Sequence, residues 1–228
     1  MSAEKRDRGG SAGPELGPLP GGHHGLSPEQ VAESQRERLL AAVVEVVAAR
    51  GYRATTIAEI VKAAAVSTRV FYANFADKEE GFLAALDAVL AHLGERLTAA
   101  AGTGRDWPDQ VIAVLRAGLE FFAAEPDLAR FCLVEPLAAT TTIARRLREA
   151  VFAAAPYLRA GRALRPADAE QLPASTEDSV LGGLLTLASR AVVAGEATAL
   201  PALLPDLVEF ALAPYLGPEP ARDLARGG

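Results

Sequence analysis

Hydrophobic residues recur along most of this 228-residue chain at the three- and four-residue spacing of one face of an α-helix. The first clear stripe lies within residues 33–50. Gly51 follows it, at the position where a glycine commonly ends a helix. No alternating apolar and polar run bounded by turn residues occurs. The pattern therefore predicts an all-α protein.

Two short helices are predicted next, each with its own capping signal. Thr56 and Glu59 form an S/T-x-x-E capping box before an apolar stripe of only two turns. Ser67 is a suitable N-cap for the second helix, whose spacing places Phe71 and Phe75 on an inward face. Two short helices joined by a tight turn after a longer supporting helix are typical of a helix-turn-helix.

The rest of the chain continues the helical pattern. Asp77 is the N-cap of a long helix whose leucines alternate steps of three and four. The last two predicted helices are apolar on nearly all sides, which requires burial on more than one face. Residues 164–175 are polar and contain proline, so a loop is expected there. Helices are predicted over residues 111–122, 127–140, 142–155, 177–195 and 202–216.

Composition divides the chain into three parts. Residues 1–26 hold seven glycines and three prolines, which predicts a flexible tail over residues 1–27. A helix-turn-helix domain is expected over residues 28–78 and a larger helical domain over residues 79–228. The chain contains no 18-residue apolar run, so no segment is expected to span a membrane. The single Cys132 excludes an internal disulfide, which fits a cytoplasmic protein.

Charge is unevenly distributed. The formal net charge is −6, whereas nucleic-acid-binding proteins typically carry an excess of basic residues. Residues 50–78 nevertheless carry five basic and two acidic side chains, a local excess of three positive charges. A polyanion would therefore be contacted in this region. The basic residues are Arg50, Arg53, Lys62, Arg69 and Lys78.

The residues of this region add a family resemblance. The run from Arg36 to Leu86 resembles the DNA-binding domain of the TetR (tetracycline-repressor) family of transcriptional regulators. Ala65 stands where that family commonly has glycine, and at positive φ it would cost about 1 kcal/mol. Val47 stands where an aromatic residue is frequent. The resemblance rests on Gly51-Tyr52, Thr55-Thr56, Val66-Ser67, Phe71-Tyr72, Phe75 and Lys78-Glu79.

The resemblance implies that residues 67–75 lie in the major groove of operator DNA. Arg69 is expected to donate two hydrogen bonds to guanine O6 and N7. Tyr72 and Lys78 are expected at phosphates, because a phenol and an ammonium both donate to phosphate oxygens. Asn74 is expected at an adenine or a phosphate. The predicted DNA-binding residues are Thr55, Thr56, Ser67, Thr68, Arg69, Tyr72, Asn74 and Lys78.

The resemblance further implies a homodimer on a palindromic operator, built by the last two long helices. Gly182 and Gly183 each cost about 1 kcal/mol inside a helix, and close helix approach is one reason to tolerate them. An intramolecular core is the alternative use of these helices. The predicted interface residues are Val180, Gly183, Leu184, Leu187, Ala191, Leu207, Phe210 and Ala211.

A ligand pocket is implied within residues 107–174, with an apolar or aromatic effector that shifts the two recognition helices and releases DNA. Plain core is the alternative for each lining residue. The predicted lining is Phe121, Phe122, Phe131, Cys132, Phe152 and Tyr157.

Catalysis is not expected, because no nucleophile lies beside a base and no glycine-rich phosphate loop occurs. No cofactor or metal is expected, since His23 and His24 make no closed metal site in a glycine-rich segment. The alternatives to a DNA-binding repressor are an activator and a helical interaction protein that has lost DNA binding.

Overall fold

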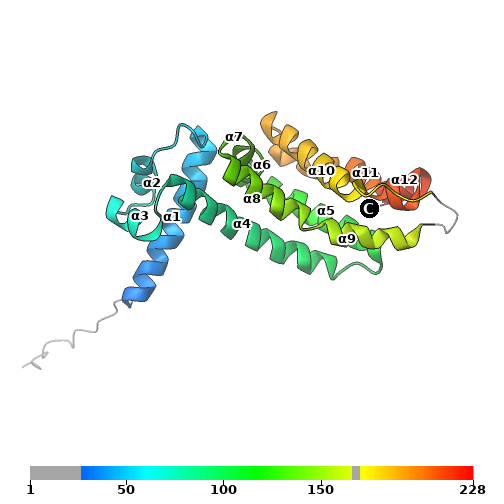
Figure 1. Ribbon diagram of the computed structural model, residues 1–228, viewed down its shortest axis with the longest axis horizontal. Helices are drawn as coiled ribbons and strands as arrows, with labels where there is room; N and C mark the ends of the chain where they lie inside the picture. Colours follow the sequence, from blue (N-terminus) through cyan, green and yellow to red (C-terminus); the bar gives the residue numbers. More distant parts are fainter. Residues whose placement is uncertain (1–26, 166–169, 228) are drawn as a thin grey trace, which may run out of the picture.

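The computed structural model describes residues 27–165 and 170–227, and its regular elements there are all helices (Figure 1). The all-α prediction is confirmed. Of the tail predicted over residues 1–27, only Ser27 is among the described residues. The elements are α1 (Pro28–Arg50), α2 (Ile57–Ala63), α3 (Thr68–Asn74), α4 (Lys78–Ala101), α5 (Trp107–Ala124), α6 (Pro126–Leu133), α7 (Glu135–Ala138), α8 (Thr141–Phe152), α9 (Ala155–Arg159), η1 (Ala160–Leu164), α10 (Thr176–Val193), η2 (Ala197–Leu203), α11 (Leu204–Leu216) and α12 (Pro218–Gly227).

Helix α1 begins earlier than its hydrophobic stripe. The Ser27 hydroxyl accepts from the Gln30 backbone N–H at 3.2 Å, and the Gln30 side chain accepts from the Ser27 N–H at 2.8 Å. This reciprocal pair satisfies two donors of the first turn without any apolar contact. At the other end Gly51 has φ 81° and donates to the Val47 carbonyl at 2.8 Å. The helix therefore ends where the glycine predicts.

Helices α1, α2, α3 and the first turns of α4 enclose one apolar cluster at the left of Figure 1. Phe71 and Phe75 of α3 are buried in it, as predicted. A Cβ on Gly81 of α4 would lie 3.3 Å from Cζ of Phe71, so this glycine lets α4 approach the ring closely. Ala65 in the turn between α2 and α3 has φ 52°, the strained conformation considered for alanine at this position.

Helix α4 leads from this N-terminal unit into an elongated second part, where it packs beside α5 (Figure 1). The helix predicted over residues 127–140 is divided into α6 and α7 at Val134. Pro136 explains the break, because proline cannot donate to a preceding helical turn and disfavours α conformation in the residue before it. Helices α10, α11 and α12 complete the side opposite α4.

The stretch Ala197–Leu216 is long and apolar enough to cross a membrane by length and composition, with a mean hydropathy of 1.3. The stretch is not the unbroken 18-residue apolar run to which the expectation referred. The stretch contains the charged residues Asp206 and Glu209, which an unbroken apolar run would exclude. In the fold, Leu207 and Ala211 bury one side of the stretch in the core, as core helices of soluble proteins also do.

Candidate nucleic-acid interface and effector cavity

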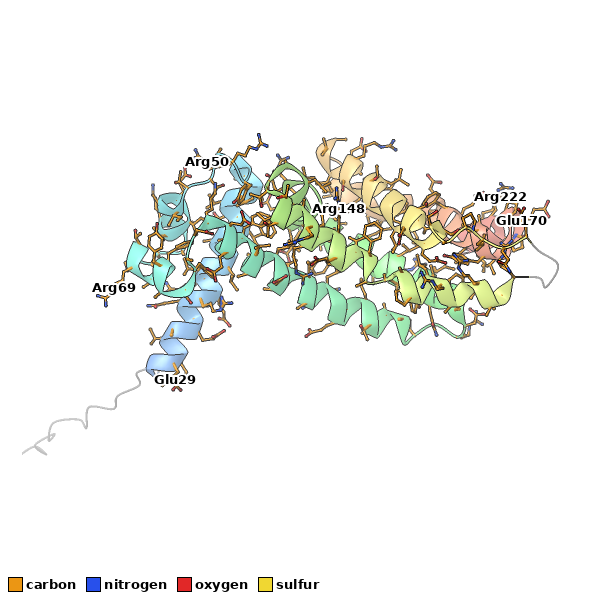
Figure 2. The ribbon with its side chains drawn as sticks, viewed as in Figure 1. Glu29, Arg50, Arg69, Arg148, Glu170 and Arg222 are labelled. Atoms are coloured by element: carbon orange, nitrogen blue, oxygen red, sulfur yellow. The ribbon has the colours of Figure 1, made fainter. Side chains whose placement is uncertain are left out.

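Helix α3 presents an exposed polar face at one end of the molecule. Thr68, Arg69 and Tyr72 are all exposed, Tyr72 to 57%. Tyr72 is three residues after Arg69 and four after Thr68, so its side chain neighbours both on the helix surface. Arg69 projects away from the body of the protein (Figure 2). The buried Phe71 ring lies 5.6 Å from the Tyr72 ring in an edge-to-face contact, which fixes the base of this surface.

The hydroxyls of Thr56 and Ser67 serve as helix caps. Thr56 accepts from the Glu59 backbone N–H at 3.3 Å, and Ser67 accepts from the Val70 N–H at 3.3 Å. Both residues are exposed at the N-termini of α2 and α3. Their hydroxyls are therefore engaged as acceptors at the backbone and remain beside the exposed face of α3.

Thr55 does not lie where the prediction requires. The residue is buried, with only 2% of its surface exposed, and its hydroxyl donates to the Gly51 carbonyl at 2.9 Å. A phosphate cannot reach this group in the described conformation. Asn74 is also partly committed, since its amide nitrogen donates to the Val70 carbonyl at 2.9 Å within α3.

Lys78 is directed inward and does not project from the surface as predicted. Its Nζ donates to the carbonyls of Tyr52 at 2.8 Å and Thr55 at 2.9 Å, and lies 4.3 Å from the centroid of the Tyr52 ring. Two of the three donors of the ammonium group are therefore used within the protein. Desolvation by burial lowers the pKa of Lys78. A positive charge at a helix N-terminus opposes the helix dipole, but here the ammonium satisfies two carbonyls of the turn between α1 and α2.

Other basic side chains complete the surface around α3. Arg50 forms an ion pair with Glu59 at 2.8 Å, so its charge is largely compensated within the N-terminal unit. Arg53 and Lys62 are exposed. Both add to the local positive charge but were not among the predicted DNA-binding residues, although an exposed basic residue near a recognition helix is a signal for phosphate contact.

An apolar cavity of about 320 Å³ lies in the second part of the protein. Its walls come from α4, α5, α6, α8, α9, α10, η2 and α11, and include Leu93, Leu115, Val151 and Leu184. Among the described residues that line it, none is charged. The volume falls within the range of small-molecule sites, roughly 300–1,000 Å³. The cavity can therefore hold an apolar molecule.

Two of the six predicted lining residues, Phe122 and Tyr157, line this cavity. Phe121 and Phe152 do not, and Phe131 and Cys132 are fully buried elsewhere in the core. The prediction selected aromatic residues, whereas the walls are mainly leucine, valine and alanine. Aliphatic residues at helical spacing look the same in sequence whether they face a core or a cavity. Burial raises the pKa of the Cys132 thiol to about 12, so it stays protonated.

The cavity reaches the surface at Gly94 of α4 and at Ala154, in the turn between α8 and α9. Both are exposed members of its lining, and a Cβ on Gly94 would meet nothing within 4 Å. About two helical turns from these residues, the Arg146 guanidinium contacts the Asp87 carboxylate at 2.6 Å. This ion pair joins α4 to α8.

The predicted interface residues on α10 and α11 divide between two faces. Val180, Leu207 and Ala211 are buried within the protomer, and Leu184 lines the cavity, which corrects their assignment. One apolar side of each helix therefore packs in the protomer's own core, which accounts for part of its apolar surface. Gly183, Leu187 and Ala191 are half-buried, and Phe210 is 42% exposed.

Gly183 has a partner within the protomer. A Cβ on this residue would lie 2.6 Å from Cζ of Phe210, so the glycine admits the ring of α11. A Cβ on Gly182 would instead meet nothing within 4 Å. Gly182 therefore leaves the outer face of α10 open.

A capped three-helix unit with an exposed arginine on its third helix, followed by helices around a cavity, defines a helix-turn-helix regulatory protein. Residues 39–85 match the family model of bacterial regulatory proteins of the tetR family. This match identifies the N-terminal domain as one of the TetR family of transcriptional regulators. The family consists of regulatory DNA-binding proteins and not of enzymes. No protein of curated function has a significantly similar sequence.

Solved structures extend the likeness in fold to most of the chain. The fatty acid degradation regulator FadR from Bacillus halodurans is 18% identical with a TM-score of 0.65, covering 84% of this chain and 98% of that one. FadR from Bacillus subtilis, solved with stearoyl-CoA, is 18% identical with a TM-score of 0.68, covering 79% and 98%. Reduced NemR from E. coli is 21% identical with a TM-score of 0.59, covering 76% and 94%.

Proposed function

We propose that this regulator is a cytoplasmic homodimer that binds a palindromic operator through α3 and is released by an apolar effector held in the cavity. Residues 28–78 would form the DNA-binding domain and residues 79–228 the effector and dimer domain. The observation that carries the proposal is the exposed face of Thr68, Arg69 and Tyr72 on a helix anchored by buried Phe71.

Arg69 is the residue proposed to read sequence. A guanidinium can donate two parallel hydrogen bonds to guanine O6 and N7, a pattern that no other base offers in the major groove. Tyr72, Arg53 and Lys62 would contact phosphates, since they are exposed around the same helix. Because one short helix reads few bases, two copies on half-sites roughly 34–36 Å apart would supply specificity.

Fluorescence anisotropy on DNA from around the protein's own gene tests this assignment at several salt concentrations. Arg69→Ala should weaken operator binding by about 1–3 kcal/mol and relax specificity at one base pair. The matched control is Lys62→Ala, which should weaken all DNA similarly and reduce the salt slope by about one. Equal loss on operator and unrelated DNA in Arg69→Ala would refute a base contact.

The effector is proposed to be a linear aliphatic chain. The cavity walls support this, because branched aliphatic side chains without charge match a hydrocarbon and leave a polar ligand without partners. The Bacillus subtilis FadR complex with stearoyl-CoA supports the same class by likeness of fold. Repression follows from this arrangement when an unliganded dimer occupies its operator, and activation is the alternative outcome.

A thermal-shift titration with stearate, stearoyl-CoA and free coenzyme A tests the effector class. Stearate or stearoyl-CoA should raise the melting temperature, since a ligand that binds only the folded state stabilises it. Ala154→Trp at the opening should abolish the shift. Ala153→Trp is the matched control, because Ala153 is exposed next to Ala154 but does not line the cavity. A shift that persists in Ala154→Trp would place the ligand elsewhere.

A further inference from the structure

A buried carboxylate joins the second part of the protein to the DNA-binding unit. Glu135 of α7 is only 5% exposed, and its Oε2 accepts from the Tyr52 backbone N–H at 2.9 Å. The two residues are 83 positions apart in sequence. Arg130 of α6 lies 3.3 Å from the other carboxylate oxygen and supplies a compensating charge. A buried polar contact of this kind fixes the relative position of the two elements that it joins.

Tyr52 is held from its other side by α4. Lys78 Nζ donates to the Tyr52 carbonyl at 2.8 Å, and the Phe82 ring packs edge-to-face on the Tyr52 ring at 5.3 Å. Glu135 and Lys78 thus bind the N–H and the carbonyl of one residue in the turn that positions α2. A displacement of α7 relative to α4 must strain or break one of these hydrogen bonds.

Two residues before Glu135, the same stretch of backbone contributes to the wall of the cavity. Leu133, the last residue of α6, lines the cavity, and its carbonyl accepts from the Ser189 hydroxyl of α10 at 2.8 Å. Phe131 packs against Phe82 with ring centroids 4.6 Å apart. The backbone from Leu133 to Glu135 therefore connects a cavity wall directly with the turn that carries the helix-turn-helix.

We propose that Glu135 is a positioning residue that transmits the occupancy of the cavity to the DNA-binding unit, with Leu133 as its contact with the cavity. The proposal rests on the effector cavity of the proposed function. A molecule that displaces Leu133 shifts the start of α7 and changes the hold of Glu135 on Tyr52. An effector alters operator affinity only by binding the two arrangements unequally, and this contact supplies the difference between them.

Amide hydrogen exchange of Tyr52, measured by NMR on the full chain, tests the connection without DNA or ligand. Leu133→Ala enlarges the cavity beside the segment and should accelerate Tyr52 exchange by about tenfold, since loosening the contact favours local opening. Leu93→Ala is the matched control, because Leu93 lines the cavity from α4. Tyr52 exchange that is unchanged in Leu133→Ala, or equally accelerated in both variants, would overturn the proposal.

The conservative variant separates positioning from stability. Glu135→Gln keeps an acceptor oxygen and should retain Tyr52 protection, whereas Glu135→Ala should lose it. In the Glu135→Ala background, Leu133→Ala should cause no further acceleration of Tyr52 exchange. Additive effects of the two changes would show that Leu133 acts on Tyr52 without Glu135, and would also overturn the proposal.

Operator affinity supplies the functional readout. Leu133→Ala should change operator affinity by about three- to tenfold in the parent and by less than about twofold in Glu135→Ala. If Leu133→Ala acted only by lowering stability, it would lower operator affinity by a similar factor in the parent and in Glu135→Ala. If the parent binds no DNA, the proposed function fails, and Tyr52 exchange still decides whether Glu135 connects the cavity to the turn.

Discussion

Substitution of Lys78 by methionine isolates the role of its ammonium group. Methionine keeps an unbranched apolar stem in the same space but removes the charge and every donor. The carbonyls of Tyr52 and Thr55 then lose the partners now at 2.8 and 2.9 Å. Their position between α1 and α2 leaves them only partly accessible to water.

The expected loss follows from these two hydrogen bonds. Each charge-assisted bond contributes about 1.5–3 kcal/mol net, and partial exposure favours the lower half of the combined range. The contact of Nζ with the Tyr52 ring adds about 0.5–1 kcal/mol. We therefore expect Lys78→Met to lower the free energy of unfolding by about 4 kcal/mol. For a chain of this size the melting temperature should fall by roughly 8–16 °C.

Differential scanning calorimetry of the parent, Lys78→Met and Lys62→Met measures this loss. Lys62 is exposed on α2, so the control removes the same charge and should change stability by less than about 0.5 kcal/mol. Equal stability of the two variants would refute the reasoning. Salt titration of operator binding adds a second criterion, because a phosphate contact of Lys78 would change the slope by about one and an internal role would not.

Three further predictions concern other parts of the fold. Ala65→Gly should stabilise the protein by about 0.5–1 kcal/mol in urea denaturation, because it relieves positive φ at some cost in unfolded-chain entropy; a loss of stability would contradict the strain. The hydrogen bond from Arg162 lowers the pKa of Glu177, so its stabilisation is complete above the unfolded pKa of about 4.3 and is lost as pH falls through the folded pKa. Glu177→Gln should therefore remove part of the acid sensitivity seen by denaturation at pH 7, 4 and 3, and an unchanged pH profile would contradict this. Phe210→Lys should convert the proposed dimer to a monomer in light scattering, whereas Leu137→Lys, an exposed apolar position outside α10 and α11, should not; a dimeric Phe210→Lys would place the interface elsewhere.

Local signals predicted the N-terminal unit closely. The capping box of α2, the glycine after α1 and the inward placement of Phe71 depend on residues within one or two helical turns. These signals act through backbone donors and side-chain spacing, which the sequence contains directly. Helix α12 and the single-turn elements carried no comparable signal, because short helices depend on tertiary packing for their stability.

The inward position of Lys78 and the lining of the cavity depend instead on contacts between distant residues. Lys78 meets a carbonyl 26 positions away, and Glu135 meets Tyr52 across 83 positions. An apolar stripe shows that a helix side is buried but not whether it faces a core, a cavity or a second chain, because all three exclude water in the same way.

The sequence by itself therefore determined the helical class and the helix-turn-helix, since these follow from local periodicity and capping, whereas the outward position of Arg69 was implied by the family resemblance. The tertiary structure alone decided which leucines surround the cavity, which faces of α10 and α11 stay open, and how Glu135 reaches the DNA-binding unit. Those features arise only when helices distant in sequence are packed together.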